Sequence, residues 1–287
     1  MLGLIDHGVP GRPHSAGGFE CSNSQDDTYA IYFGLGQSLD LINAPLVFKV
    51  SLAGLRLGHY LVRSSDTTTL TSGFLDVGTG SGVHALLMRK LGGSDITATD
   101  ISEKSIDQAM IHERLNFKKE GISFHVSNLF ESIPKNKFHT IVFNPPGWRT
   151  PSTSLARKLE SLEQEGQIPA RAMFYGDEVI ARFLEDLPLY LSPAGRAVIG
   201  LNSMVGIRDV LQKYNEKHEG TPPLSYRLME RHTFPLLYYS TQWQMLSRSL
   251  KAEFEQWSKQ GLAAYSIDRN GEIYWSYEII ELVHRTT

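Results

Sequence analysis

One short stretch constrains the fold of this chain more than any other. Phe74–Val77 is an apolar run with one acid, and it leads directly into Gly78-Thr79-Gly80-Ser81-Gly82. The next residues, Val83–Lys90, place apolar side chains at helical spacing. A strand, a glycine turn and a helix in this order are typical of a nucleotide site at the carboxyl edge of a parallel sheet. Glycine lets the backbone approach a ligand closely, and the start of the helix offers unpaired N–H groups.

The spacing of the glycines excludes two common nucleotide sites. A dinucleotide fingerprint requires a third glycine three residues after the second, and Val83 occupies that position. A phosphate-binding loop requires Gly-Lys followed by Ser or Thr, which this turn lacks. Two interpretations stay open for the turn taken alone, namely a site for another nucleotide or a tight structural turn.

Length and composition describe an ordinary globular protein. The 287 residues suffice for one large α/β domain with an appendage or for two small domains. The chain has 41% hydrophobic residues, no apolar run near the length of a membrane span and no signal pattern at its N-terminus. Cys21 is the single cysteine and the ten histidines are scattered, so we expect no disulfide, no metal site and a cytoplasmic location. The net charge of −3 provides no basic field, which argues against a nucleic-acid substrate.

Strands and helices alternate through most of the chain. Residues 1–27 predict a loose arm, and Thr28–Phe33 with Ser38–Ile42 predict a hairpin. The further predicted strands are Gly73–Val77, Ser94–Asp100, Ile122–Val126, Phe138–Phe143, Arg196–Leu201, Leu224–Phe234 and a closing hairpin of Ala263–Ile267 and Ile273–Val283. The predicted helices are Ser51–Val62, Val83–Lys90, Ser102–Asn116, Asp177–Leu191, Ile207–Lys217 and Gln242–Gln260. This alternation predicts an α/β fold built on a doubly wound, mostly parallel sheet.

Asp100 is the second candidate element of the site. It ends the predicted strand Ser94–Asp100 and lies 18 residues past Gly82. An acid at this distance from a glycine turn can accept hydrogen bonds from both hydroxyls of a ribose. The alternative is a helix cap or a solvated strand end, and the glycine turn at this distance favours the ribose role.

Asn144-Pro145-Pro146 is the sharpest functional signal in the sequence. Neither proline has a backbone N–H, so the segment presents carbonyl acceptors on a stiff frame, and Asn144 adds a side-chain carbonyl. Two acceptors can hold both hydrogens of an amide or amino NH₂ and turn its nitrogen toward an electrophile. The alternative is a turn that ends a strand. The position after the fourth predicted strand of the sheet, downstream of the other elements, favours the functional interpretation.

Together, Asp76–Gly82, Asp100, Asn128 and Asn144–Pro146 resemble the motifs of class I S-adenosylmethionine-dependent methyltransferases with an Asn-Pro-Pro motif. This group of N-methyltransferases includes the release factor glutamine methyltransferases and enzymes that act on exocyclic amines of adenine or guanine. The resemblance covers roughly residues 28–205. It implies a mostly parallel, seven-stranded Rossmann-like sheet with a last strand that is an antiparallel edge strand. It also implies S-adenosyl-L-methionine as cofactor and S-adenosyl-L-homocysteine as product.

The resemblance assigns a role to each residue of these motifs. The cofactor would be held by Asp76, Gly78, Thr79, Gly80 and Gly82, its ribose by Asp100, and its adenine by Ile101 and the polar side chain of Asn128. The catalytic motif would be Asn144, Pro145 and Pro146, with Asn144 also beside the cofactor.

The chain departs from the family pattern at two places. Upstream of the glycine turn, family members commonly have Pro and Thr near the methionine moiety, where this chain has Val50 and Gly54. After Asn-Pro-Pro they usually have Tyr or Phe, whose ring packs on a planar substrate, and this chain has Gly147 followed by Trp148. Either Trp148 supplies the substrate-binding ring from a shifted position, or the substrate is not flat.

We divide the chain into an N-terminal arm and hairpin over residues 1–50 and a methyltransferase domain over residues 51–287. Segments near 148–176 and 235–262 are expected to form a cap over the substrate together with the arm. Within them, aromatic residues such as Trp243 either belong to a core or line a pocket. Basic residues after the Asn-Pro-Pro motif, among them Arg149 and Arg157, alternate with acids and favour a solvated helix over a nucleic-acid patch.

We therefore expect an N-methyltransferase that acts on an amide or amino nitrogen. Its substrate would be a small molecule or a glutamine-like peptide or protein, and RNA base methylation is the third alternative. A rival of another class is a catalytically silent subunit with a methyltransferase fold. The intact Gly78, Gly80, Gly82, Asp100 and Asn144 argue against that rival. The sequence indicates neither the methyl acceptor nor the oligomeric state.

Overall fold

The computed structural model describes residues 28–135, 137–163, 165–166, 168–237 and 241–285. The predicted arm over residues 1–27, which contains Cys21, lies outside the described residues. The central sheet has the order β5-β4-β3-β6-β7-β10-β8, and β9 pairs with the end of β10. These strands are β3 (Phe74–Val77), β4 (Ile96–Asp100), β5 (Ile122–Val126), β6 (Phe138–Phe143), β7 (Leu191–Asn202), β8 (Leu224–Pro235), β9 (Tyr265–Ile267) and β10 (Ile273–His284).

The sheet confirms the doubly wound, mostly parallel prediction, with two corrections. Strands β5, β4, β3, β6 and β7 are parallel neighbours, whereas β10 is antiparallel to both β7 and β8. The last strand is thus antiparallel as expected, but it lies inside the sheet and β8 forms the edge. The sheet of the described residues has eight strands instead of seven, because the short β9 folds back onto β10.

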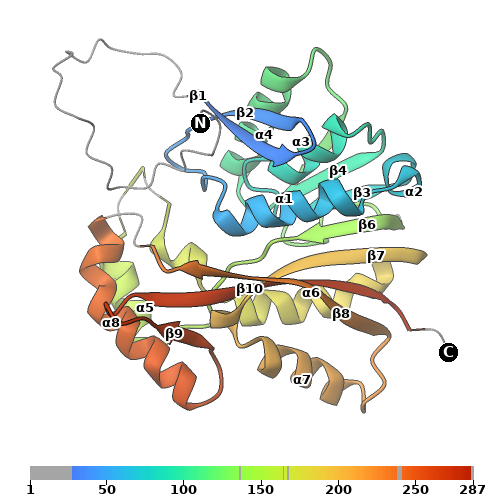
Figure 1. Cartoon of the computed structure of the whole chain (residues 1–287). Coiled ribbons are helices and arrows are strands. Elements are labelled where there is room, and N and C mark those ends of the chain that lie inside the picture. Colours follow the sequence, from blue (N-terminus) through green and yellow to red (C-terminus); the bar gives the residue numbers. More distant parts are fainter. Residues whose placement is uncertain (1–27, 136, 164, 167, 238–240, 286–287) are drawn as a thin grey trace, which may run out of the picture.

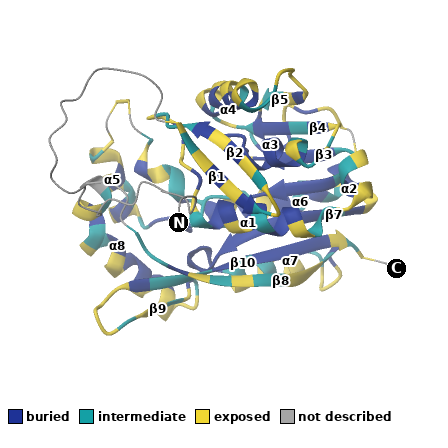
Figure 2. Ribbon diagram, turned by 45° about the horizontal axis from the view of Figure 1, so that its top comes forward, coloured by how far each residue is buried: buried dark blue, intermediate teal, exposed yellow. Residues whose placement is uncertain are grey.

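Helices cover both faces of this sheet (Figure 1). On one face lie α1 (Leu52–Ser64), α3 (Val83–Lys90) and α4 (Glu103–Asn116), and on the other α6 (Gly176–Tyr190) and α7 (Ile207–Lys217). Because both faces are covered, the inner strands are apolar on both sides, and all four residues of β3 are buried. Figure 2 shows buried residues concentrated in these central strands.

The predicted N-terminal hairpin forms an outer layer over the helices of the first face. Its strands β1 (Thr28–Gly34) and β2 (Gln37–Ile42) pair antiparallel and alternate between buried and exposed residues, as expected for a sheet with one packed face. The backbone N–H of Ile42 donates to His112 Nε2 at 3.0 Å, which ties β2 to α4. Gly58 on α1 makes room for Phe33, since a Cβ at residue 58 would lie 2.5 Å from that ring.

The helix ends follow from their capping residues. Ser51 Oγ accepts from the N–H of Gly54 at 3.1 Å, and Ser102 Oγ accepts from the N–H of Ser105 at 3.3 Å, so these serines cap α1 and α4. The sequence pattern did not predict a short helix, α2 (Thr67–Thr71). Asp66 caps this helix, since its Oδ1 accepts from the N–H of Thr69 at 2.8 Å.

Two segments, one between β6 and β7 and the other between β8 and β9, pack against each other and form an apolar cluster of their own. They contain α5 (Thr153–Ser161), the 3₁₀ turn η1 (Ala170–Met173) and α8 (Thr241–Lys259). Glu253 on α8 binds both the N–H and the hydroxyl of Ser152, at 2.6 and 2.8 Å, which fixes the start of α5 on α8. The shared core of these segments, named the cap cluster below, includes Trp148, Leu155, Leu159, Phe174, Leu250, Phe254 and Trp257. That it covers a substrate stays a prediction.

Arg149 departs from the expectation of a solvated helix after the Asn-Pro-Pro motif. Its side chain is buried and its guanidinium pairs with Asp177 at 3.2 Å and Asp209 at 3.3 Å. Both acids lie in the first turn of a helix, α6 and α7 respectively. Arg149 therefore links the start of the cap cluster to the second face of the sheet, a role that the mixed charge pattern did not indicate.

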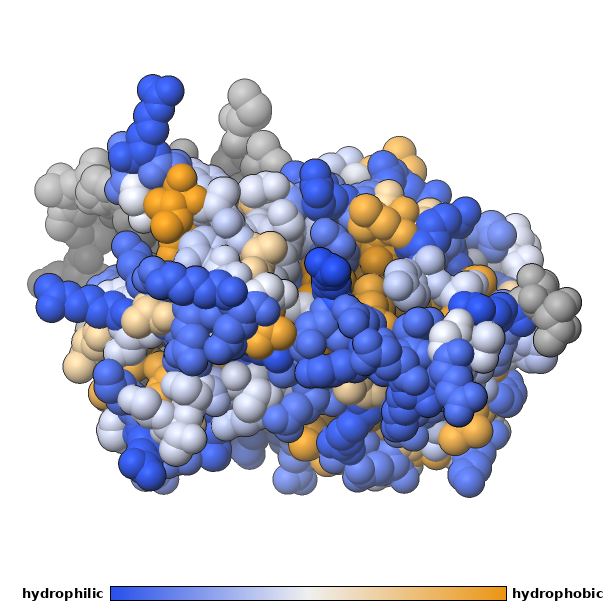
Figure 3. Space-filling model, turned by 90° about the horizontal axis from the view of Figure 1, so that it is seen from below, coloured by the Kyte–Doolittle hydropathy of each residue, from blue (hydrophilic) through white to orange (hydrophobic). Residues whose placement is uncertain are grey.

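The surface seen from below the sheet is mostly hydrophilic, with apolar residues in separate small groups (Figure 3). The edge strand β8 carries Arg227, Glu230 and Arg231, and charged side chains on an edge oppose pairing with another chain. Among the helices that the structure describes, none has the length and apolarity needed to cross a membrane.

The contact between Gly58 and Phe33 gives a stability test of the hairpin layer. We expect Gly58→Ala to lower the free energy of unfolding, because overpacking costs about 1–3 kcal/mol and exceeds the gain of about 1 kcal/mol in helix propensity. Gly54→Ala on the same helix is the matched control, since a Cβ there makes ordinary contacts of 3.5 Å or more. Urea unfolding measures both, and equal stability of the two variants would contradict the packing of β1 on α1.

Candidate active site

The register of the sheet brings the three predicted elements together. Val77 on β3 pairs with Phe143 on β6 and with Thr99 on β4. The glycine turn, Asn144 and Asp100 follow these three strand ends directly, so all three lie at the carboxyl edge of the sheet. This is the position at which doubly wound sheets bind nucleotides.

The glycines of the turn serve different needs. Gly78, Gly80 and Gly82 all have positive φ, between 56° and 82°. A Cβ at residue 82 would lie 2.8 Å from Cβ of Ala109, so glycine is required there for α3 and α4 to approach. A Cβ at residue 80 would meet nothing within 4 Å, so the open side of the turn is at Gly80.

Asp76 and Thr79 face into the protein and shape the turn. Asp76 Oδ2 accepts from the hydroxyl of Thr79 at 2.6 Å and from the N–H of Ala85 at 3.2 Å. Both side chains are buried, and burial raises the pKa of Asp76. These bonds join the end of β3 to the first turn of α3. A direct contact of either side chain with a cofactor stays a prediction.

Asp100 has the acceptor capacity that the ribose role requires. Its Oδ2 accepts from the N–H of Gly80 at 2.8 Å, and its Oδ1 accepts from the N–H of Ser102 at 2.9 Å. The Ser105 side chain also bonds to this carboxylate. A carboxylate has about four acceptor positions, so acceptor capacity is left for a hydroxyl group. Burial raises the pKa of Asp100 despite these two N–H groups. The residues present therefore fit the ribose of S-adenosylmethionine.

The two residues predicted to contact adenine lie on the same side of the site as Asp100. Ile101 is 71% exposed, so its side chain is accessible to a flat ring. Asn128 follows β5 and is half-buried, and its Nδ2 donates to Glu131 at 3.1 Å. Its role toward the adenine amino group stays a prediction.

The Asn-Pro-Pro motif is half-buried at the end of β6. Asn144 Oδ1 accepts a hydrogen bond from the hydroxyl of Tyr277 on β10 at 2.8 Å. The carbonyl of Pro146 lies against Gly176, where any Cβ would collide with it. The start of α6 thus covers this carbonyl, which leaves Asn144 and the carbonyl of Pro145 as the candidate acceptors of the motif.

The positions after the motif supply no exposed ring. A Cβ at residue 147 would lie 2.7 Å from Nδ2 of Asn202, so Asn202 occupies the space that a larger residue would need. Trp148 is 5% exposed and packs edge-on against Phe174, Trp243 and Phe254, with ring centroids 4.9–5.2 Å apart. The packing places Trp148 in the cap cluster, and its contact with a substrate stays a prediction.

Two buried histidines, which the sequence analysis did not single out, support the site. His84 Nε2 lies 2.8 Å from the carbonyl of Gly54, and this contact links α3 to the start of α1 near Asn144. His112 Nδ1 lies 2.8 Å from the carbonyl of Ser81, while its Nε2 accepts from the N–H of Ile42. The hairpin β1–β2 therefore contacts the glycine turn through His112. A single histidine on an apolar helix face is common in protein cores, so its spacing gave no functional signal.

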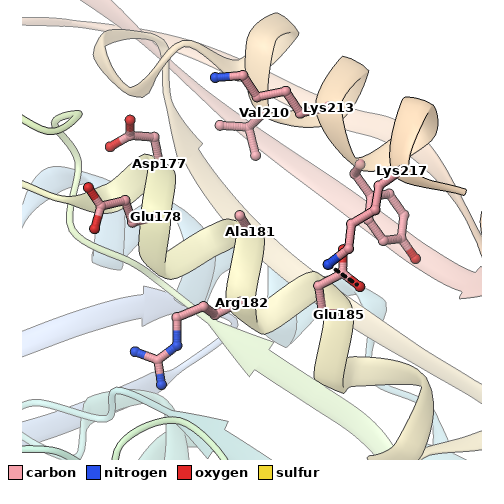
Figure 4. Close-up of a pocket in the computed structure, with 9 residues that line it drawn as sticks. Asp177, Glu178, Ala181, Arg182, Glu185, Val210, Lys213 and Lys217 are labelled. Carbon is pink, nitrogen blue, oxygen red and sulfur yellow. Dashed lines mark ion pairs between the residues drawn. The ribbon is translucent and has the colours of Figure 1, made fainter.

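A groove of about 300 Å³ lies elsewhere, between α6 and α7 (Figure 4). Its lining mixes both charges, and Lys217 reaches across it to Glu185 at 3.1 Å. None of the residues predicted for the site lines this groove. Within the described part of the chain, no three His, Cys, Asp or Glu side chains are placed to hold a metal ion.

Asp100 provides the direct test of nucleotide binding at this edge. We expect Asp100→Ala to weaken binding of S-adenosylhomocysteine by about 1.5–3 kcal/mol, the range for hydrogen bonds to a charged group. The exposed Asp95, at the opposite end of β4, gives the matched control Asp95→Ala, which should bind normally. Isothermal titration calorimetry that shows equal affinity in both variants would remove Asp100 from the site.

Comparison with known proteins agrees with this geometry. The profile of a family described as "Methyltransferase domain" matches residues 71–205, which include all three elements of the site. A protein of Methanocaldococcus jannaschii that carries the name of a protein N5-glutamine methyltransferase is 30% identical over 139 residues, or 48% of this chain and 66% of that one. A release factor glutamine methyltransferase of Rhodopirellula baltica is 31% identical over 157 residues, or 53% of this chain and 52% of that one.

The fold also matches a solved structure at low sequence identity. The 16S rRNA N2 G1207 methyltransferase RsmC of T. thermophilus, in complex with AdoMet and guanosine, superposes with a TM-score of 0.54 at 15% identity. The match covers 92% of this chain and 52% of RsmC, and it shows the fold alone. This chain therefore spans only about half to two thirds of the length of these two curated relatives. The sheet, the glycine turn and these matches support a class I S-adenosylmethionine-dependent methyltransferase that is similar to the release factor glutamine methyltransferases.

Proposed function

We propose that this chain is an N-methyltransferase that transfers a methyl group to the side-chain amide of a glutamine in a protein or peptide. The observation that carries the proposal is the pairing of Val77 with Phe143, which sets the glycine turn beside the half-buried Asn-Pro-Pro motif. The sequence relatives named for glutamine methylation support the choice of acceptor.

The cofactor of the family is S-adenosylmethionine, which when bound supplies an electrophilic methyl group and leaves as S-adenosylhomocysteine. Asp100 would bind the ribose hydroxyls, and Ile101 would pack on the adenine. Gly80 would let the cofactor lie close to the backbone of the turn, since space is open on that side. The side chains of Asp76 and Thr79 would hold the turn in shape from inside.

Asn144 and Pro145 would bind and orient the acceptor. The NH₂ group of a primary amide has two hydrogens, and Asn144 Oδ1 and the carbonyl of Pro145 would each accept one of them. This arrangement turns the nitrogen toward the methyl group, and orientation alone can lower the barrier substantially. A primary amide loses one of these protons to the surroundings once the N–C bond has formed.

The residues after the motif favour an amide over a nucleobase. Enzymes that stack a base on a ring need an exposed aromatic face beside the acceptor site. Gly147 has no side chain, Asn202 fills the neighbouring space, and Trp148 is buried in the cap cluster. The net charge of −3 also provides no basic field for phosphates.

Label transfer tests the class of acceptor. We expect methyl label from S-adenosylmethionine to appear in the protein fraction of a treated cell extract, and mass spectrometry of the digest to locate it on glutamine. Asn144→Ala protein serves as the background. Label recovered in RNA as a methylated adenine or guanine would contradict the proposal, as would label found in small molecules alone.

Asn144 tests the mechanism. We expect Asn144→Ala to lower kcat by on the order of 100-fold, because the acceptor loses its orientation, and to leave affinity for S-adenosylhomocysteine nearly unchanged. The exposed Asn215 on α7 gives the matched control Asn215→Ala, which should retain full activity. A normal turnover rate in Asn144→Ala would refute the mechanism. Loss of cofactor binding together with loss of folding would instead show that the motif is a structural turn.

A further inference from the structure

The chemical role of Asn144 depends on which way its side-chain amide is turned. A half turn of the amide exchanges an acceptor oxygen for an NH₂ donor. The proposed mechanism requires the oxygen, because a second NH₂ group would repel the NH₂ of the acceptor. Something in the protein must therefore hold Asn144 in one of the two orientations.

The hydroxyl of Tyr277 is placed to do this. It donates to Asn144 Oδ1 at 2.8 Å, and the tyrosine side chain is 1% exposed. On the opposite side of the amide, Asn144 Nδ2 faces α1, where it would lie 3.8 Å from a Cβ at Gly54. The amide oxygen is therefore bonded from β10, and the amide nitrogen lies on the side of α1.

Tyr277 reaches Asn144 only because an intervening strand lacks a side chain. The sheet order is β6-β7-β10, so the ring must cross β7 to reach the end of β6. Gly200 on β7 lies under the ring, and a Cβ there would collide with the tyrosine hydroxyl. Phe234 and Trp275 flank the ring, with centroids 6.4 and 6.3 Å away. The missing side chain at Gly200 thus leaves the space through which Tyr277 reaches Asn144.

The protonation state of Tyr277 suits a donor. Burial raises the pKa of its hydroxyl far above the usual value for tyrosine, so the proton is retained at every physiological pH. A neutral phenol can donate or accept, and here it donates, because Asn144 Oδ1 faces the hydroxyl at 2.8 Å while Nδ2 lies on the side of Gly54. A carbonyl oxygen has two lone pairs. With one lone pair of Asn144 Oδ1 engaged by Tyr277, the second remains free for an N–H of the acceptor.

We propose that Tyr277 is a positioning residue for the methyl transfer, which holds the Asn144 amide with its oxygen toward the acceptor nitrogen. This inference rests on the proposed function. It extends the site to β10, the last strand of the chain, which lies outside the segment matched by the methyltransferase family.

Tyr277→Phe removes the hydroxyl and keeps the ring. We expect kcat to fall about 10-fold, in line with the loss of one hydrogen bond, while KM for S-adenosylmethionine stays within about twofold. In the Asn144→Ala background the same change should have no further effect on kcat, because the group that Tyr277 positions is absent. An equal loss of kcat in the wild-type and Asn144→Ala backgrounds would show that Tyr277 has only a structural role, and it would overturn the inference.

A second buried tyrosine gives the matched control. The hydroxyl of Tyr190 at the end of α6 donates to the carbonyl of Phe130 at 3.3 Å, and its ring stacks on Phe130. We expect Tyr190→Phe to lower the thermal unfolding temperature to a similar extent as Tyr277→Phe while it leaves kcat normal. If Tyr190→Phe lowers kcat as much as Tyr277→Phe does, the effect comes from stability and the inference fails.

The side-chain amide signals of Asn144 in isotope-labelled protein give a readout that needs no acceptor. We expect one sharp pair of NH₂ signals in the wild type and a broadened or doubled pair in Tyr277→Phe. Unchanged signals in that variant would refute the positioning role even if glutamine methylation is confirmed. A wild type that methylates no amide refutes the proposed function, and these signals still decide the role of Tyr277.

Discussion

The parallel pairing of β3 with β6 is the interaction on which the site depends. Both strands are buried between two helical layers, and their register places Val77 opposite Phe143. Shifting this register by one residue would move every side chain of one strand to the opposite helical layer, against neighbours that it does not fit. The core that stabilises the sheet therefore also sets the distance between the glycine turn and the Asn-Pro-Pro motif. No loop has to bring these two elements together.

At this edge, the polar side chains that face the open side are held by hydrogen bonds from groups behind them. Asp100 and Asn144 each keep acceptor capacity toward the open side, while other groups hold them from behind. Backbone N–H groups of Gly80 and Ser102 hold Asp100, and the hydroxyl of Tyr277 holds Asn144. The hairpin and α1 reach the same region through His112 and His84. The elements added around the sheet thus contribute to the geometry of the site as well as to stability.

Much of this structure could be predicted from local pattern. The sheet strands, the capped helices and the residues at the ends of β3, β4 and β6 follow from periodicity, glycine spacing and proline chemistry, which act over a few residues. What was missed depends on contacts between distant segments. The insertion of β10 between β7 and β8, the burial of Arg149 by two helix starts, and the reach of Tyr277 over Gly200 have no local signature. The packing of Trp148 into the cap cluster depends in the same way on α8, which follows it by about a hundred residues.

The central claim is that the carboxyl edge of β3, β4 and β6 binds the methyl donor and faces its sulfur toward Asn144. The most direct measurement is a crystal structure of the protein with S-adenosylhomocysteine. The account predicts both ribose hydroxyls on the Asp100 carboxylate, the adenine against Ile101 and the sulfur on the side of Asn144. A nucleoside bound away from Asp100, or a sulfur directed away from the Asn-Pro-Pro motif, would contradict it.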